Sequence, residues 1–242
     1  MTPSPGTWNE RRDTRRMPET TAIEIALKGR KPPAYIAVEG PIGVGKTTLA
    51  KRLAASFNYQ VVLENAEENP FLERFYRNRK QAALATQLFF LFQRSQKIHD
   101  LRQADIFEPV RVADFLIEKD PLFARVNLDR DEFQLYQKVY QQLTIDAPRP
   151  DLVIYLQAAP DVLLGRIENR GIAAERGIER DYLERLNEVY SEFFLYYDDA
   201  PLLIVNASEL DLANSEADYI QLVDYLLEIR SGRHYFNPTF FG

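Results

Sequence analysis

A glycine-rich stretch at residues 40–48, Gly-Pro-Ile-Gly-Val-Gly-Lys-Thr-Thr, combines residue types that bind phosphate. It fits the pattern G-x-x-x-x-G-K-[ST], follows an apolar segment at 34–38 that predicts a buried strand, and precedes a segment at 48–57 with the apolar spacing of a helix. Between a strand and a helix, the backbone N–H groups of such a loop surround an anion at the helix N-terminus. The alternative, a glycine-rich turn with a chance lysine, would not be expected to lie between a strand and a helix. Lys46 would reach the β- and γ-phosphates of a nucleoside triphosphate, and the Thr47 hydroxyl would bind Mg²⁺. The predicted ATP contacts are Gly40, Gly43, Gly45, Lys46, Thr47 and Thr48.

Two acidic residues come directly after segments that predict strands. Glu64 follows 60–63, and Asp114 follows 110–113. The Glu64 carboxylate could accept the proton of a hydroxyl that attacks a γ-phosphate. The alternative interpretation of Glu64 is an ordinary solvated acid in a loop. Asp114 has the arrangement of an acid that holds Mg²⁺ directly or through water. An N-cap of the following helix is the other interpretation of Asp114, and the two roles are compatible.

Arg166 and Arg170 lie four residues apart on one face of a predicted helix at 160–170, and Arg176 follows in a charged loop at 171–178. Arginines on a mobile segment beside a phosphate can stabilise the transferred charge. We therefore predict a helical lid next to the phosphate loop, with Arg166 and Arg170 as catalytic cations. The alternative is a solvated face on which these arginines pair with neighbouring glutamates.

Gln87 and Arg94 lie seven residues apart in a predicted helix at 81–101, two turns along one face and among three phenylalanines. An amide and a guanidinium on an aromatic-rich face can bind the edge of a base and stack on it. From these residues alone, core aromatics beside two surface polar groups are the better-supported interpretation.

Apolar runs and helical periods alternate along the chain, which predicts a parallel sheet covered by helices on both faces. The predicted strands are 34–38, 60–63, 110–113, 151–156 and 202–205. The further predicted helices are 71–76, 115–126, 130–144, 182–197 and 219–229. The apolar stripe expected on the helix at 81–101 consists of Leu84, Leu88, Leu91, Phe92 and Ile98. The expected fold is an α/β P-loop NTPase fold with a five-stranded parallel sheet flanked by helices. Ligands of such sheets bind at the carboxyl ends of the strands, which singles out Gly40, Glu64 and Asp114.

Composition narrows the function classes. The 242 residues suit one α/β domain, and the formal charge of −6 argues against a nucleic-acid polymer held on a broad basic face. The absence of cysteine excludes disulfides and thiol catalysis, and no apolar run approaches the length of a membrane span. Residues 1–30 have neither an apolar period nor the features of a targeting signal, so we expect a flexible N-terminal segment, a domain over 31–232 and a C-terminal tail over 233–242.

The segment at 63–76, Leu-Glu-Asn-Ala-Glu-Glu-Asn-Pro-Phe-Leu-Glu-Arg-Phe-Tyr, resembles the segment after the second strand of deoxynucleoside kinases. It is most similar to the bacterial deoxyadenosine/deoxyguanosine branch, in which the pattern is roughly E-N-x-x-x-N-P-[FY]-L-x-x-F-Y. The resemblance spans roughly residues 34–206, and this string is much more specific than the phosphate loop.

The resemblance implies a role for each matching residue. Glu64 corresponds to the general base for the 5′-hydroxyl, and Tyr76 and Glu175 correspond to groups that hold the sugar 3′-hydroxyl. Asp114 corresponds to the acid of a D/E-R-S motif, and Arg166 and Arg170 to lid arginines. The base-binding side chains correspond to Gln87, Arg94 and Asp120. The implied enzyme is a phosphotransferase with an alcohol acceptor that uses ATP and Mg²⁺ on a deoxynucleoside, a purine being expected, in nucleotide salvage. A cytoplasmic homodimer without membrane or nucleic-acid partners is implied as well.

Two arginines of the family pattern are missing. Phe115 stands where D/E-R-S has arginine, and Ile172 stands where the lid has its second arginine. Arg111 or Arg176 is the candidate substitute. The missing cations motivate an alternative, a catalytically weak or inactive nucleotide-binding subunit of a larger complex, against which stand the intact loop and Glu64. A nucleoside monophosphate kinase such as thymidylate kinase is a third possibility, but its acceptor site needs more cations.

Overall fold

The computed structural model describes residues 30–104, 110–144 and 147–237, so the predicted N-terminal segment lies, apart from Arg30, outside the described residues. One six-stranded sheet with the order β2-β3-β1-β4-β5-β6 forms the centre, and every neighbouring pair is parallel. The strands are β1 Tyr35–Glu39, β2 Gln60–Val62, β3 Arg111–Ala113, β4 Leu152–Gln157, β5 Leu202–Asn206 and β6 Arg233–Phe236. The α/β fold and the five predicted strands are confirmed.

The strand count of five is wrong, because Arg233–Phe236 of the expected C-terminal tail forms β6. This strand pairs in parallel with β5 at the edge of the sheet, with Leu202 opposite Arg233 and Val205 opposite Phe236. Its side chains are mostly polar or partly exposed, so it lacks the apolar run that identifies the inner strands.

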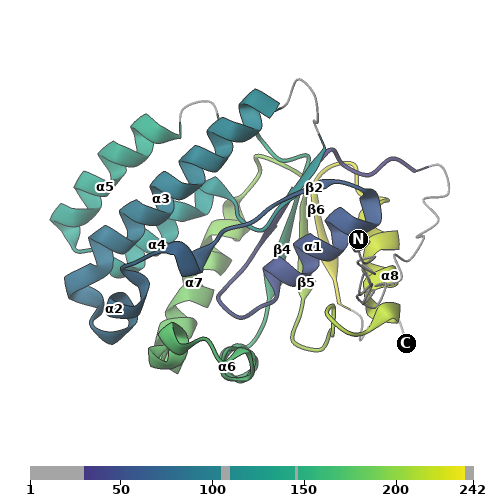
Figure 1. Ribbon diagram of the computed structural model, residues 1–242. Coiled ribbons are helices and arrows are strands. Elements are labelled where there is room, and N and C mark those ends of the chain that lie inside the picture. The colour runs from purple at the N-terminus through teal and green to yellow at the C-terminus, as the bar shows by residue number, and fades with distance from the viewer. Residues whose placement is uncertain (1–29, 105–109, 145–146, 238–242) are drawn as a thin grey trace, which may run out of the picture.

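Eight α-helices lie within the described residues (Figure 1): α1 Lys46–Phe57, α2 Leu72–Arg77, α3 Arg79–Ala104, α4 Asp120–Asn127, α5 Arg130–Leu143, α6 Pro160–Arg170, α7 Arg180–Tyr196 and α8 Glu216–Leu226. Three 3₁₀ turns accompany them: η1 Ala66–Glu68, η2 Ile117–Lys119 and η3 Ala173–Gly177. No helix of the described part is both long and apolar enough to cross a bilayer.

The helices cover the sheet in two layers. On one face α1 and α8 lie side by side, joined by a 2.7 Å hydrogen bond between the hydroxyls of Ser56 and Tyr219 (Figure 1). On the other face Tyr155 of β4 stacks on Phe194 of α7, with ring centroids 4.1 Å apart, and α3, α4 and α5 extend this layer beyond the sheet. The residues of the four inner strands, β3, β1, β4 and β5, are almost fully buried between the layers, which makes this the hydrophobic core.

Three local predictions differ from the structure. The helix expected at 115–126 begins at Asp120, because Leu116 is extended, its N–H donates to Glu39, and Ile117–Lys119 form η2. Phe92 is 53% exposed and is not part of the apolar stripe of α3. The loop expected at 171–178 contains the 3₁₀ turn η3.

Candidate active site

The phosphate loop connects β1 to α1, and its glycines allow backbone that other residues avoid. Gly40, Gly43 and Gly45 have φ angles of 150°, 82° and 104°. A Cβ at Gly40 would lie 2.4 Å from the carbonyl oxygen of Leu156 on β4. No side chain caps α1, so its first-turn N–H groups remain available to an anion at the positive end of the helix dipole.

Lys46 points back over the loop that precedes it. Its Nζ donates to the carbonyl oxygens of Gly40 and Pro41 at 2.7 and 3.1 Å. Burial lowers the pKa of Lys46 to about 8, and the nearby ammonium of Lys119 acts in the same direction. An anionic phosphate beside Lys46 would favour its charged form.

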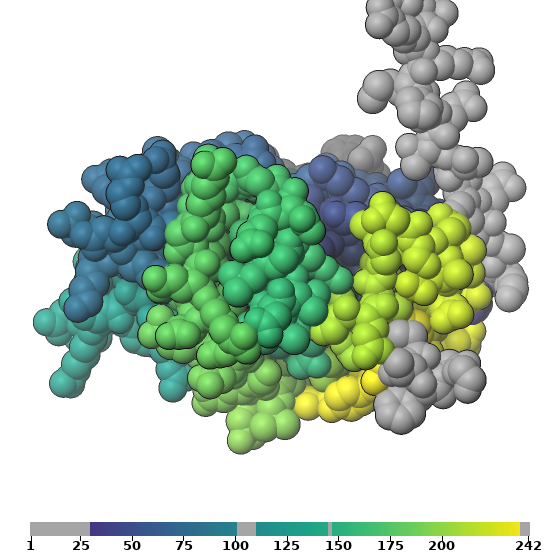
Figure 2. All heavy atoms as spheres, turned by 90° about the horizontal axis from the view of Figure 1, so that it is seen from below, coloured from purple at the N-terminus to yellow at the C-terminus, as the bar shows by residue number. Residues whose placement is uncertain are grey.

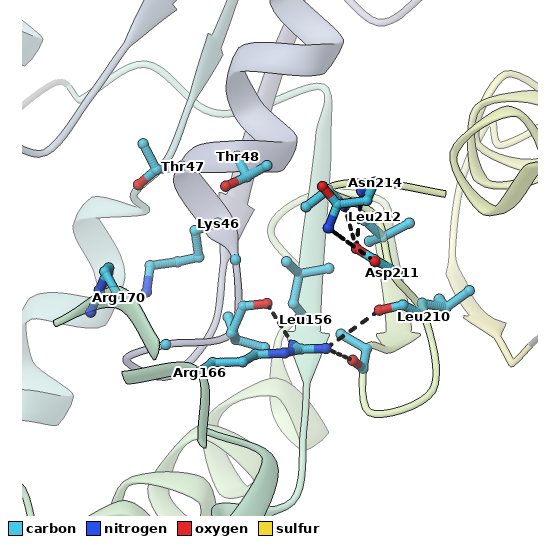
Figure 3. Close-up of a pocket in the computed structure, with 15 residues that line it drawn as sticks. Lys46, Thr47, Thr48, Leu156, Arg166, Arg170, Leu210, Asp211, Leu212 and Asn214 are labelled. Carbon is cyan, nitrogen blue, oxygen red and sulfur yellow. Dashed lines mark hydrogen bonds between the residues drawn. The ribbon is translucent and has the colours of Figure 1, made fainter. Parts of the chain in front are cut away.

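A cavity of about 330 Å³ opens beside this loop. Its other walls are α6 and the segment 207–214 after β5; Figure 2 shows the hollow, with purple loop atoms behind green and yellow-green segments. Arg166 of α6 donates to the carbonyl oxygens of Val44 at 3.2 Å and Ala207 at 2.7 Å (Figure 3). The Arg166 guanidinium therefore connects the phosphate loop to the segment after β5. We call the cavity of about 330 Å³ the donor cavity.

Thr47 and Asp114 form a pair of hard oxygen ligands at the edge of the loop. The Thr47 hydroxyl donates to Oδ2 of Asp114 at 2.5 Å, and the N–H of Glu64 donates to Oδ1 at 2.6 Å. Burial raises the pKa of Asp114, while these two bonds oppose the rise. The described residues contain no cluster of three His, Cys, Asp or Glu side chains that could hold a metal. A hydroxyl and one carboxylate beside a phosphate site nonetheless fit Mg²⁺, which takes few protein ligands and completes its shell with phosphate and water. Asp114 does not cap α4, which begins six residues later.

A second cavity, of about 120 Å³, lies on the other side of the loop. We call it the acceptor cavity. Glu64 borders it, with Arg94 bound to Oε1 and Nζ of Lys119 3.5 Å from Oε2. Burial alone would raise the pKa of Glu64, but Arg94, Lys119 and Lys46 together lower it to about 2. Glu64 is therefore an anion ready to accept a hydrogen bond.

The far end of the acceptor cavity is lined by buried polar side chains. Arg94 of α3 pairs with Asp120 as well as with Glu64, and Gln87 is only 4% exposed. Within the described residues, Oγ1 of Thr86, Nε of Arg94 and Oδ2 of Asp120 have no hydrogen-bond partner. Buried polar groups are costly to leave unpaired, so these atoms fit a ligand that presents donors and acceptors.

Tyr76 and Glu175 lie on a third side of the acceptor cavity. Glu175 of η3 is 7% exposed and accepts a hydrogen bond from Arg170 at 2.5 Å. Burial raises the pKa of the Tyr76 phenol well above its usual value, so the phenol stays neutral and can donate. A tyrosine hydroxyl and a carboxylate next to each other suit a sugar hydroxyl.

The family model of deoxynucleoside kinases matches residues 36–229 of the chain. The chain belongs to this family. It is 36% identical over 203 residues to a deoxyguanosine kinase of Bacillus subtilis, which covers 81% of this chain and 97% of the relative. It is 30% identical over 206 residues to a deoxyadenosine/deoxycytidine kinase of the same organism, covering 81% and 93%. A solved structure of deoxyadenosine kinase from M. mycoides, with the products dCMP and dCDP, superposes with a TM-score of 0.69 at 30% identity and covers 81% of this chain and all of that one.

The structure brings the predicted site residues of this deoxynucleoside kinase to the two cavities and their shared wall. The loop residues and both lid arginines line the donor cavity, apart from Gly40, which forms the start of the loop. Glu64, Tyr76, Gln87, Arg94 and Glu175 line the acceptor cavity together with Asp114. Asp120 reaches the cavity through its ion pair with Arg94.

Arg111 is the wrong substitute for the missing arginine of the kinase. It opens β3 opposite Tyr35, at the amino end of the strands, with its guanidinium 4.7 Å from the Tyr35 ring centroid. Arg176 is exposed and is not a lining residue of either cavity. Phe115 itself is 1% exposed and belongs to the core.

Two charged residues of the site were missed by the sequence analysis. Lys119 lines the acceptor cavity, and Glu39, at the end of β1, pairs with it at 3.2 Å. The rule that pointed to Glu64 and Asp114, an acid at the carboxyl end of a parallel strand, applies equally to Glu39. Lys119 directly precedes Asp120, but nothing in its spacing indicates that it is buried.

Proposed function

We propose that this kinase transfers the γ-phosphoryl group of ATP to the 5′-hydroxyl of a deoxynucleoside, with Mg²⁺ as the cofactor and a purine as the preferred base. The observation that carries the proposal is the shared wall of the two cavities. Both cavities are lined by Gly43, Lys46, Thr47 and Arg170. A triphosphate in one cavity and a hydroxyl in the other would therefore meet at Lys46.

The residues around the shared wall suit phosphoryl transfer. Glu64 would accept the proton of the 5′-hydroxyl while the 5′-oxygen bonds to the γ-phosphorus and ADP leaves. Thr47 and Asp114 would hold Mg²⁺, which neutralises charge on the phosphates. The backbone N–H of Glu64, the proposed general base, donates to Oδ1 of Asp114, the proposed metal ligand. This hydrogen bond would fix the positions of the two residues relative to each other.

The polar side chains at the far end of the acceptor cavity would bind the base, and Tyr76 with Glu175 the 3′-hydroxyl. A purine is supported by the relatives named deoxyguanosine kinase and deoxyadenosine kinase. A wrong base would leave buried polar atoms such as Nε of Arg94 unpaired, which disfavours it.

The other interpretations are less well supported. Nothing at the site favours the non-catalytic subunit. A nucleoside monophosphate would bring a further phosphate, yet Arg94, Lys119 and Arg170 of the acceptor cavity are each paired with a carboxylate. A role in nucleotide salvage, the homodimer and the cytoplasmic location stay predictions from the resemblance.

A turnover panel tests the proposal. Purified protein with ATP and Mg²⁺ is assayed on deoxyadenosine, deoxyguanosine, deoxycytidine and thymidine, with Lys46→Ala as the control. We expect the fastest turnover with a purine and its loss in the control. Glu64→Gln should lower kcat by about 10²–10⁴-fold, because the proton acceptor is lost, while ATP binding is retained, because Glu64 does not line the donor cavity. A pyrimidine preference would refute the base assignment, and ATP binding without any turnover would refute the kinase.

A further inference from the structure

Lys119 is a buried cation in the acceptor cavity, and its partners set it apart from an ordinary internal ion pair. It is 1% exposed at the end of η2. Its Nζ lies 3.2 Å from Oε2 of Glu39 and 3.5 Å from Oε2 of Glu64. A buried ammonium needs a carboxylate partner, and one is enough for neutrality. Lys119 instead lies between two carboxylates, one of which is the proposed general base.

Glu39 gives Lys119 a fixed anchor. Glu39 is 0% exposed and borders neither cavity. Its Oε1 accepts from the N–H of Gly40 at 2.8 Å and from the Tyr190 hydroxyl at 2.9 Å, and its Oε2 accepts from the N–H of Leu116 at 2.9 Å. A carboxylate held by so many donors cannot swing, so the fold itself sets the position of the Lys119 ammonium.

The two oxygens of Glu64 have different partners. Arg94 binds Oε1 of Glu64 and also pairs with Asp120. Arg94 can therefore release Glu64 and remain paired with Asp120. Lys119 faces Oε2 and stays in place because Glu39 holds it. When a hydroxyl takes the place of Arg94 at Oε1, the carboxylate is still oriented through Oε2.

The acceptor side also needs positive charge. Glu39, Glu64 and Asp114 are close to the point where a triphosphate would bring further negative charge, and Phe115 and Ile172 occupy positions where arginine is expected. Arg166 is engaged with backbone carbonyls in the donor cavity. Besides Arg94, Lys119 is a second cation of the acceptor cavity that the fold holds against Glu64.

We propose that Lys119 is a positioning residue for phosphoryl transfer: anchored on Glu39, it holds one oxygen of Glu64 so that the other accepts the 5′-hydroxyl proton, and it supplies the acceptor-side positive charge that Phe115 and Ile172 lack. The proposal rests on the proposed function. The proton moves from the 5′-hydroxyl to Glu64, the 5′-oxygen bonds to the γ-phosphorus as the bond to ADP breaks, and Lys119 keeps its own protons throughout.

The test compares four variants with the wild type in full steady-state kinetics. They are Lys119→Met, Lys119→Arg, the double variant Glu39→Gln with Lys119→Met, and Lys138→Met, an exposed lysine of α5, as the matched control. Lys119→Met alone leaves the buried Glu39 carboxylate without its cation and could prevent folding. The double variant removes both buried charges, so it should fold even if Lys119→Met does not. Melting temperature and ATP binding are measured for each.

We expect Lys119→Met to lower kcat by about 10²–10³-fold with little change in KM for the deoxynucleoside, because the interaction acts in the transition state. Lys119→Arg should recover part of the loss. The double variant should melt near the wild type yet stay slow, because Glu64 has lost its clamp. A double variant that is both stable and fast would overturn the proposal and make the pair purely structural, as would a loss confined to KM. A wild type that phosphorylates no deoxynucleoside would instead refute the proposed function.

Discussion

At the scale of single residues, Arg94 links the two ends of the acceptor cavity. Its guanidinium pairs with both Glu64 and Asp120. A deoxynucleoside bound as proposed, with its base at Arg94 and its 5′-hydroxyl at Glu64, would replace the contact between these two residues. Under the proposed roles, substrate binding would exchange these partners and would couple recognition of the nucleobase to release of the Glu64 carboxylate.

The depressed pKa of Glu64 predicts how the stability of the protein depends on pH. A carboxyl whose pKa falls from 4.5 to about 2 on folding stabilises the folded state above its unfolded pKa. That contribution is lost as the pH falls from about 4.5 through about 2. In urea unfolding at a series of pH values, the wild type should lose stability over this window more steeply than Glu64→Gln. Parallel curves for the two proteins would show that the cations around Glu64 do not stabilise its charge.

The sequence predicts residues of the candidate site where a simple rule on their position after a strand applies. Glu64 and Asp114 each follow the carboxyl end of a parallel strand, so their meeting at one edge of the sheet could be expected. Lys119 could not be foreseen, because its contact with Glu64 depends on η2 turning the chain between β3 and α4. Phe92 shows the reverse case, since helical spacing does not reveal that its part of α3 is left uncovered.

At the scale of elements, the junction of β1, the phosphate loop and α1 is the most constrained part of the site. Gly40, at the start of the loop, lies directly against the backbone of β4. The positive φ angles of the loop glycines turn the chain, so that the N-terminus of α1 faces the donor cavity. Stability and phosphate binding therefore depend on the same backbone.

Alanine substitutions at two glycines test this dependence. Gly40→Ala should lower both the free energy of unfolding and ATP affinity, since its Cβ would meet a β4 carbonyl at 2.4 Å. Gly165→Ala is the matched control inside α6, where a Cβ meets nothing within 4 Å. It should leave turnover intact and stabilise the protein by roughly 0.5–1 kcal/mol, because glycine is a poor helix former. Urea unfolding and ATP titration measure both effects, and equal behaviour of the two variants would contradict the steric argument.

Elements with a strong apolar pattern are predictable, and those held by tertiary contacts are not. The helix at 160–170 coincides with α6, whose N-terminus carries proline and whose C-cap is Gly171. The start of α4 was misplaced because a hydrogen bond from Leu116 to Glu39, distant in the sequence, holds Leu116 in an extended backbone. The edge strand β6 was missed because an edge strand needs no apolar run.

At the scale of the molecule, the strand order explains why two cavities meet at one loop. The chain winds from β1 toward β3 and β2 on one side and toward β4, β5 and β6 on the other. The donor cavity lies over β4 and the segment after β5, and the acceptor cavity lies over the ends of β2 and β3. The phosphate loop thus sits at the switch point of the sheet, where ligands of such folds bind.

Binding of ATP at this central position should stabilise the whole domain. At 100 times its Kd, a ligand that binds only the folded state adds about 2.7 kcal/mol, which for a protein of this size raises the melting temperature by roughly 5–10 °C. Lys46→Ala should abolish most of this shift, whereas Lys51→Ala, an exposed lysine of the same helix, should keep it. Thermal melts with and without Mg²⁺-ATP measure the difference, and an unchanged shift in Lys46→Ala would place ATP elsewhere.

The partners of Glu39 determine when during synthesis the site can exist. They lie 77, 80 and 151 residues further along the chain. A ribosome completes the phosphate loop early, but the partners that fix Glu39 and Lys119 come from segments made much later. Until Tyr190 has emerged from the exit tunnel, a nascent chain can carry the nucleotide-binding motif without an assembled catalytic centre.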